Sequence, residues 1–272
     1  MSLQKTLASK EERDRIMLIK QDFYFNSLGA VRPLHIRIPD EGEGPFPVMY
    51  FFDGHNLFRD EDATYGKSWG LDEYCAGWDK QIIIVGIECG HGPDERMSEY
   101  LPYGRAKGWL SSYEPLGDRT MQGIIYELKP YIDSVFPTIP FRECTAIGGS
   151  SMGGLMAAYA LVKYNQYISK AACLSPSLGS VSGSLWHDMN NTYISPDTRM
   201  YLSWGTQEGN GKIADPDSVD TSSWIYRTCK GTANKITAAG GEAMLYCQVG
   251  GRHCEADWEK QLGIFMPFLW QQ

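Results

Sequence analysis

The sequence predicts an α/β fold in which a mainly parallel central sheet is covered by helices on both faces. Short, continuous apolar runs recur along the chain, and such runs are typical of strands that are buried on both sides. Helical patterns alternate with these runs, which favours parallel pairing of the strands. A length of 272 residues with 43% hydrophobic residues is sufficient for one large domain with a substantial core.

The elements can be assigned in order along the chain. Residues 1–20 are charged and are expected to form a helix or a loose arm, while residues 21–272 form a single domain. Two antiparallel edge strands are predicted around residues 23–27 and 32–39, because apolar and polar residues alternate in the second. Buried strands are predicted at residues 48–52, 81–87, 144–149, 170–174, 200–204 and 243–249. Helices are predicted at residues 68–78, 120–136, 155–164, 219–238 and 254–270. Long connections are usually functional, so the irregular stretches 89–119 and 175–199 are expected to form the pocket.

The most informative motif is a serine between two glycines. Gly149-Ser-Ser-Met-Gly153 fits the pattern G-x-S-x-G, with a strand predicted before it and a helix after it. A serine on such a sharp turn needs flanking residues without side chains, because the chain passes closely beneath it. The helix that follows directs its free N–H groups toward the site, which favours a developing oxyanion. Ser151 is therefore predicted to be a nucleophile.

A serine nucleophile needs a base and a carboxylate that orients the base. In this type of sheet the three residues follow the order serine, acid, histidine. Of the five histidines, only His253 follows both Ser151 and the strand that would carry the acid. The two glycines before His253 would let its loop fold back over the serine. His253 is therefore the predicted base.

Glu208 is the predicted acid, because it follows the carboxyl end of the strand at residues 200–204. Asp215 and Asp217 remain alternatives farther along a polar, glycine-rich loop. The oxyanion hole needs two N–H groups that point to one place. The amide of Met152, directly after the nucleophile, is one candidate. The amide of His55, in the loop after the strand at residues 48–52, is the other.

Composition excludes several classes of function. A net charge of −8 argues against nucleic acid or an anionic membrane as a partner. No window approaches 18 apolar residues, so no transmembrane segment is predicted. The seven cysteines are scattered and odd in number, which indicates a reducing, cytoplasmic location. The sequence has no H-E-x-x-H motif, and its histidines and cysteines lack ligand spacing, so no metal and no cofactor are expected. Whether the chain forms a homo-oligomer stays open.

Six blocks of the sequence together resemble the putative esterase family, over about residues 30–270. The blocks are FFDGHNLF at 51–58, YGKSWG at 65–70, RMSEY at 96–100, GSSMGG at 149–154, GTQE at 205–208 and GRH at 251–253. This family is similar to enterochelin esterases, feruloyl esterases, esterase D type enzymes and the mycobacterial mycolyltransferases. The resemblance implies an α/β-hydrolase fold and a small-molecule ester as the substrate. It also supports the five site residues named above in their predicted roles.

The acyl or alcohol pocket is predicted to include Trp69 and Tyr100, because each lies after the carboxyl end of a strand. Ordinary packing beneath the long loops is the alternative for both side chains. Short acyl or aryl esters are the expected substrates, since no large apolar lid helix is evident. Two other functions stay open from sequence: an acyltransferase that uses the same acyl-enzyme, and a non-catalytic binding protein on a hydrolase fold.

Overall fold

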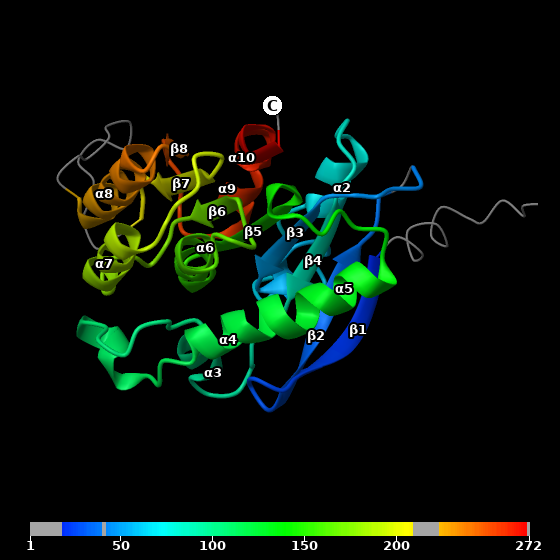
Figure 1. The fold of residues 1–272 in the computed structure, drawn as a ribbon, viewed down its shortest axis with the longest axis horizontal. Coiled ribbons are helices and arrows are strands. Elements are labelled where there is room, and N and C mark those ends of the chain that lie inside the picture. The colour runs from blue at the N-terminus through cyan, green and yellow to red at the C-terminus, as the bar shows by residue number, and fades with distance from the viewer. Residues whose placement is uncertain (1–17, 40–41, 209–222, 271–272) are drawn as a thin grey trace, which may run out of the picture.

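The central feature of the fold is one sheet of eight strands (Figure 1). The computed structural model describes residues 18–39, 42–208 and 223–270. The strands lie in the order β1-β2-β4-β3-β5-β6-β7-β8. The strands are β1 Leu18–Phe25, β2 Ala30–Arg37, β3 Val48–Phe52, β4 Ile83–Ile87, β5 Thr145–Ser150, β6 Lys170–Leu174, β7 Arg199–Gly205 and β8 Glu242–Gln248. β1 and β2 pair antiparallel at one edge, and the other strands run parallel to one another. The predicted sheet is confirmed.

Helices cover both faces of this sheet, as expected. Figure 1 shows α2 and α10 on one side, and α4, α5 and α6 on the other. The α-helices are α2 Leu71–Ala76, α3 Glu95–Glu99, α4 Gly117–Gly123, α5 Lys129–Val135, α6 Met152–Lys163, α7 Ser182–Asn191, α8 Trp224–Ala238, α9 Glu255–Glu259 and α10 Leu262–Trp270. The 3-10 helices are η1 Gly54–Asn56, η2 Gly108–Ser112 and η4 Arg142–Cys144, and the π-helix η3 Ile124–Leu128 joins α4 to α5. None of the helices in these described ranges is long and apolar enough to cross a membrane.

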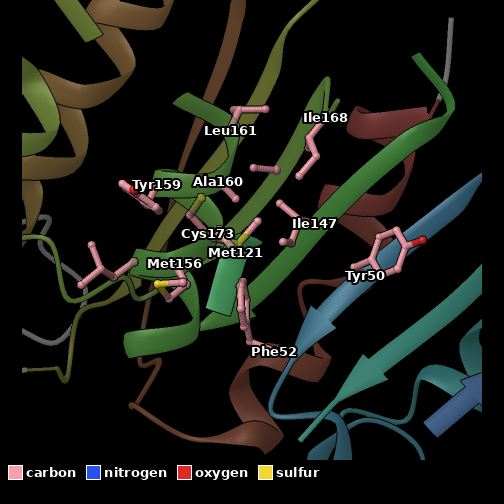
Figure 2. Close-up of a cluster of buried hydrophobic side chains, with 14 of the residues drawn as sticks. Tyr50, Phe52, Met121, Ile147, Met156, Tyr159, Ala160, Leu161, Ile168 and Cys173 are labelled. Atoms are coloured by element: carbon pink, nitrogen blue, oxygen red, sulfur yellow. The ribbon is translucent and has the colours of Figure 1, made fainter. Parts of the chain in front are cut away.

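Each face of the sheet has its own hydrophobic cluster. The larger cluster lies beneath α4, α5, α6, α7 and α8, and the smaller one beneath α2, α9 and α10. Figure 2 shows part of the larger cluster, which includes Met156 and Leu161 of α6, Ile147 of β5 and Phe52 of β3. The strands β3, β4 and β5 are buried along their whole length, which explains why they appear in the sequence as uninterrupted apolar runs.

Several predicted boundaries are wrong for local reasons. The helix predicted at 68–78 begins only at Leu71, because Gly70 before it has a left-handed backbone with φ of 60°. The closing helix is divided into α9 and α10. The stretch 175–199 contains α7, in which only Leu185 and Met189 are buried, so its helical pattern is weak. Residues 18–20, which we assigned to the arm, belong to β1, and residues 1–17 lie outside the described ranges.

Candidate active site

Ser151 lies on a strained turn between β5 and α6. Its backbone has φ of 58° and ψ of −118°, a region that residues with a side chain rarely adopt. Two backbone hydrogen bonds hold it there: the Ser151 N–H donates to the carbonyl of Leu174 at 2.9 Å, and the N–H of Ser177 donates to the carbonyl of Ser151 at 3.0 Å. A Cβ added at Gly149 would lie 2.7 Å from the carbonyl carbon of Gly153, so the close approach expected beneath the serine is present.

Glu208 and His253 lie side by side at the ends of β7 and β8. Oε2 of Glu208 is 2.9 Å from Nδ1 of His253. The Glu208 side chain is only 6% exposed and that of His253 is 45% exposed, so a buried carboxylate holds an accessible ring. The loops that carry them are in close contact, since a Cβ at Gly205 would lie 2.2 Å from the carbonyl oxygen of Gly251. With Nδ1 facing the carboxylate, Nε2 of His253 is available to take a proton. The alternative acids Asp215 and Asp217 lie outside the described residues.

Sequence reasoning missed two residues that orient the acid. Oε1 of Glu208 accepts hydrogen bonds from the hydroxyl of Ser175 at 2.6 Å and from the N–H of Gly205 at 2.7 Å. The Ser175 oxygen in turn accepts a hydrogen bond from the indole N–H of Trp258 at 3.0 Å. The Trp258 ring also packs edge to face against His253, with 5.1 Å between centroids. The position of Ser175 directly after β6 was a usable signal, whereas no motif marks Trp258.

The loop after β3 forms a tight turn beside the first turn of α6. Asp53 begins the turn with a left-handed backbone, φ 58° and ψ 51°, and His55 lies within η1. The carboxylate of Asp53 is held by two hydrogen bonds from Arg96, at 2.8 and 2.7 Å. A Cβ at Gly153 would lie 3.2 Å from Oδ2 of Asp53, so this turn touches the helix that begins with Met152. The fold therefore brings the two predicted oxyanion donors to neighbouring turns.

A cavity of about 610 Å³ is lined by Ser151, Glu208 and His253. Its aromatic walls are Trp109, from the stretch 89–119, and Trp224, at the start of α8. Leu110, Ile225, Thr228 and the serines 175, 177 and 180 also line it. The expectation that residues 89–119 and 175–199 contribute to this pocket is thus confirmed.

The structure corrects the predicted roles of Trp69 and Tyr100. Their exposed fractions are 2% and 1%, and neither is among the described residues that line the cavity of Ser151. Trp69 packs in the core against Phe51 and Trp258. Tyr100 accepts a hydrogen bond from the N–H of Asp53 at 3.0 Å. Ordinary packing is therefore the better account of Trp69, and support of the Asp53 turn is the better account of Tyr100.

We expect Tyr100→Phe to lower kcat by about 10-fold with little change in KM. The substitution leaves the buried N–H of Asp53 without its acceptor, which costs about 1–3 kcal/mol and loosens the turn that carries His55. The measurement is steady-state hydrolysis of p-nitrophenyl acetate. Tyr103→Phe is the matched control, because it removes a hydroxyl that donates to Asp188 at 2.9 Å away from the cavity lining. Equal kcat values for the two variants would contradict this role.

A serine elbow and a histidine–carboxylate pair on a mainly parallel sheet define the class of α/β-hydrolases. The family described as "Putative esterase" matches residues 26–267. The chain belongs to this family, and the resemblance found in the sequence is confirmed.

Two known proteins are similar to this chain in sequence. An uncharacterized protein of Bacillus subtilis, YbbA, is 25% identical over 62% of this chain and 64% of its own length. The chain therefore spans less than two thirds of that relative. The siderophore triacetylfusarinine C esterase of Aspergillus fumigatus is 24% identical over 80% of this chain and 75% of its own.

Solved structures share the fold. The BES protein of Bacillus cereus has a TM-score of 0.68 at 18% identity and covers 99% of this chain and 98% of its own. Enterochelin esterase of Shigella flexneri has a TM-score of 0.70 at 16% identity, over 94% of this chain and 58% of its own. A ferulic acid esterase has a TM-score of 0.62 at 17% identity, over 93% of this chain and 97% of its own. The predicted α/β-hydrolase fold is therefore confirmed.

Proposed function

We propose that the protein is a serine hydrolase that cleaves carboxylic esters through an acyl-enzyme on Ser151. The observation that carries this proposal is the 2.9 Å contact between Glu208 and His253, in one cavity with a serine on a strained elbow. An unstrained, buried serine would not be presented to a substrate. A lone surface histidine would not have a buried carboxylate fixed behind its ring by two further hydrogen bonds.

The reaction then proceeds in two halves. His253 takes the hydroxyl proton of Ser151 as Oγ attacks the ester carbonyl, and Glu208 stabilises the imidazolium that forms. The amides of His55 and Met152 hold the negative oxygen of the tetrahedral intermediate. His253 protonates the leaving alcohol as the C–O bond breaks. It next takes a proton from water as the water oxygen attacks the acyl carbon. It returns this proton to Oγ of Ser151 as the bond between the acyl carbon and Oγ breaks, which releases the acid and the free serine.

The lining of the cavity favours an uncharged ester with an aromatic part. Among its described lining residues the only ionisable ones are Glu208 and His253, which the reaction itself uses. Trp109 and Trp224 are 58% and 51% exposed at this cavity, an unusual state for such large apolar side chains. Indole faces bind flat rings by stacking. The similarity to a ferulic acid esterase supports the same class of substrate.

We expect the protein to hydrolyse methyl benzoate and methyl acetate, and expect Trp224→Ala to lower kcat/KM selectively for the benzoate. Loss of one aromatic contact is worth about 0.5–1.5 kcal/mol, or up to about 10-fold. Tyr193→Ala is the control, because this side chain is 79% exposed and lies outside the cavity lining. An equal loss for both esters in Trp224→Ala would contradict an aryl pocket.

The same assay separates the alternative functions. Products are analysed with and without an added acceptor alcohol. Formation of a new ester at the expense of the acid would indicate an acyltransferase. A folded protein that turns over none of the esters would instead favour a binding protein on a hydrolase fold.

A further inference from the structure

Three histidines converge on one carboxylate away from the cavity of Ser151. Glu88 lies directly after β4, and its Oε1 is 2.6 Å from Nε2 of His35 on the neighbouring strand β2. Its other oxygen, Oε2, is 2.6 Å from Nε2 of His91 and 3.9 Å from Nδ1 of His55. The His55 and His91 rings lie 5.2 Å apart. Glu88 and His91 are three residues apart in one loop, whereas His35 comes from a strand and His55 from another loop.

His55 carries an unpartnered ring nitrogen that faces this carboxylate. Its Nε2 lies 2.9 Å from the hydroxyl oxygen of Thr64. Its Nδ1 is buried and has no hydrogen-bond partner, and the side chain is only 10% exposed. The 3.9 Å to Oε2 of Glu88 is too long for a hydrogen bond. In the tautomer in which Nε2 donates a hydrogen bond to the hydroxyl oxygen of Thr64, the Nδ1 lone pair faces the carboxylate. A cation between the two would be stabilised by both the lone pair and the carboxylate.

We propose that Nδ1 of His55, Oε2 of Glu88 and Nε2 of His91 bind a divalent transition-metal ion of the zinc type. One ligand atom from each of these three residues lies within 4.8 Å of the other two. Tetrahedral zinc with bonds of about 2.1 Å holds its ligand atoms roughly 3.4 Å apart, so modest movements of the side chains complete the site. Two imidazoles and one carboxylate favour zinc over magnesium or calcium, which prefer oxygen ligands.

Neighbouring groups already orient the proposed ligands. Thr64 fixes the far nitrogen of His55, and His35, itself 3% exposed, holds Oε1 of Glu88 so that Oε2 faces inward. Such outer contacts are typical of metal sites, in which they set the direction of each ligand. An open cavity of about 570 Å³ borders the cluster, which leaves room for water as a further ligand.

The ion would support the oxyanion turn and would not act on the ester. The described residues that line this second cavity are different from those that line the cavity of Ser151. The ring of His55 belongs to the metal site, whereas its backbone belongs to η1 beside the first turn of α6. A bound metal ion would therefore hold η1 in place from behind.

The test is a titration of the chelator-treated protein with zinc chloride, in which isothermal titration calorimetry measures the binding. We expect wild-type protein to bind one zinc ion per chain and His91→Gln to bind it at least about 10-fold more weakly. The His91 side chain is 61% exposed, so its replacement should keep the fold. His187→Gln, on the exposed surface of α7, is the matched histidine control and should bind as wild type does.

Two further measurements make the result decisive. Zinc should raise the Tm of wild-type protein and of His187→Gln, but not that of His91→Gln. The titration is repeated on His253→Ala, because the Glu208–His253 pair could also bind zinc. The proposed site would be overturned if the wild type showed no saturable zinc binding, or if His91→Gln bound zinc with the same affinity as the wild type. It would also be overturned if zinc binding disappeared only in His253→Ala. Ser151→Ala should bind zinc normally, so failure of the hydrolase proposal and failure of the metal site are distinguishable.

Discussion

Ser151→Ala is expected to lower kcat by about 10⁵-fold or more, which is typical when the nucleophile of a serine hydrolase is removed. The backbone strain at Ser151 persists only because the surrounding chain enforces it, and its purpose is to present the hydroxyl. Alanine keeps the elbow and the glycine contacts beneath it but cannot form the acyl-enzyme. The loss should therefore appear in kcat, while the folded state remains intact.

The measurement is steady-state hydrolysis of p-nitrophenyl butyrate, with thermal unfolding as the check on folding. Ser177→Ala is the matched control, because Ser177 lines the same cavity and its bond to Ser151 uses only the backbone. We expect that variant to stay within a few-fold of wild type. Loss of activity in Ser177→Ala, with Ser151→Ala still active, would place the nucleophile elsewhere.

His253→Ala is expected to have a similarly large effect, about 10⁵-fold in kcat. The hydroxyl of Ser151 is a poor nucleophile unless a base takes its proton, and His253 is the base that the Glu208 carboxylate orients. Residues that act as a unit give non-additive losses. The double variant Ser151→Ala/His253→Ala should therefore be about as slow as either single variant.

The comparison uses the same ester and adds two further variants. His187→Ala, on the exposed surface of α7, should retain wild-type kcat. Glu208→Ala should lose less activity than His253→Ala, because the base remains present although it is no longer oriented. Losses that multiply in the double variant would mean that Ser151 and His253 act in separate steps.

Local sequence patterns were sufficient to predict the sheet and the elbow. The β3, β4 and β5 runs are fully buried, so hydrophobicity alone marks them. The order of serine, acid and histidine along the chain pointed to Glu208 and His253 because parallel strands end at one edge of the sheet. The structure brings these two side chains together as that order predicts.

Features that depend on packing between distant segments could not be predicted in this way. Trp69 and Tyr100 follow strand ends, but their side chains turn into the core, while Trp109 and Trp224 form the cavity. The hydrogen bond from Ser175 to Glu208 joins the ends of β6 and β7, which only the folded sheet makes neighbours. In the histidine cluster around Glu88, the close spacing of Glu88 and His91 is visible in the sequence, but the approach of His55 from the loop after β3 is not.

The central claim is that Ser151 is the activated nucleophile of an ester hydrolase. The most direct measurement is mass-spectrometric mapping of the adduct formed with a fluorophosphonate, run beside hydrolysis of p-nitrophenyl acetate and butyrate. We predict one adduct, on Ser151, with turnover lost in proportion to labelling and no labelling in His253→Ala over the same time. A folded protein that forms no adduct and turns over neither ester, or one labelled at another serine, would contradict the claim.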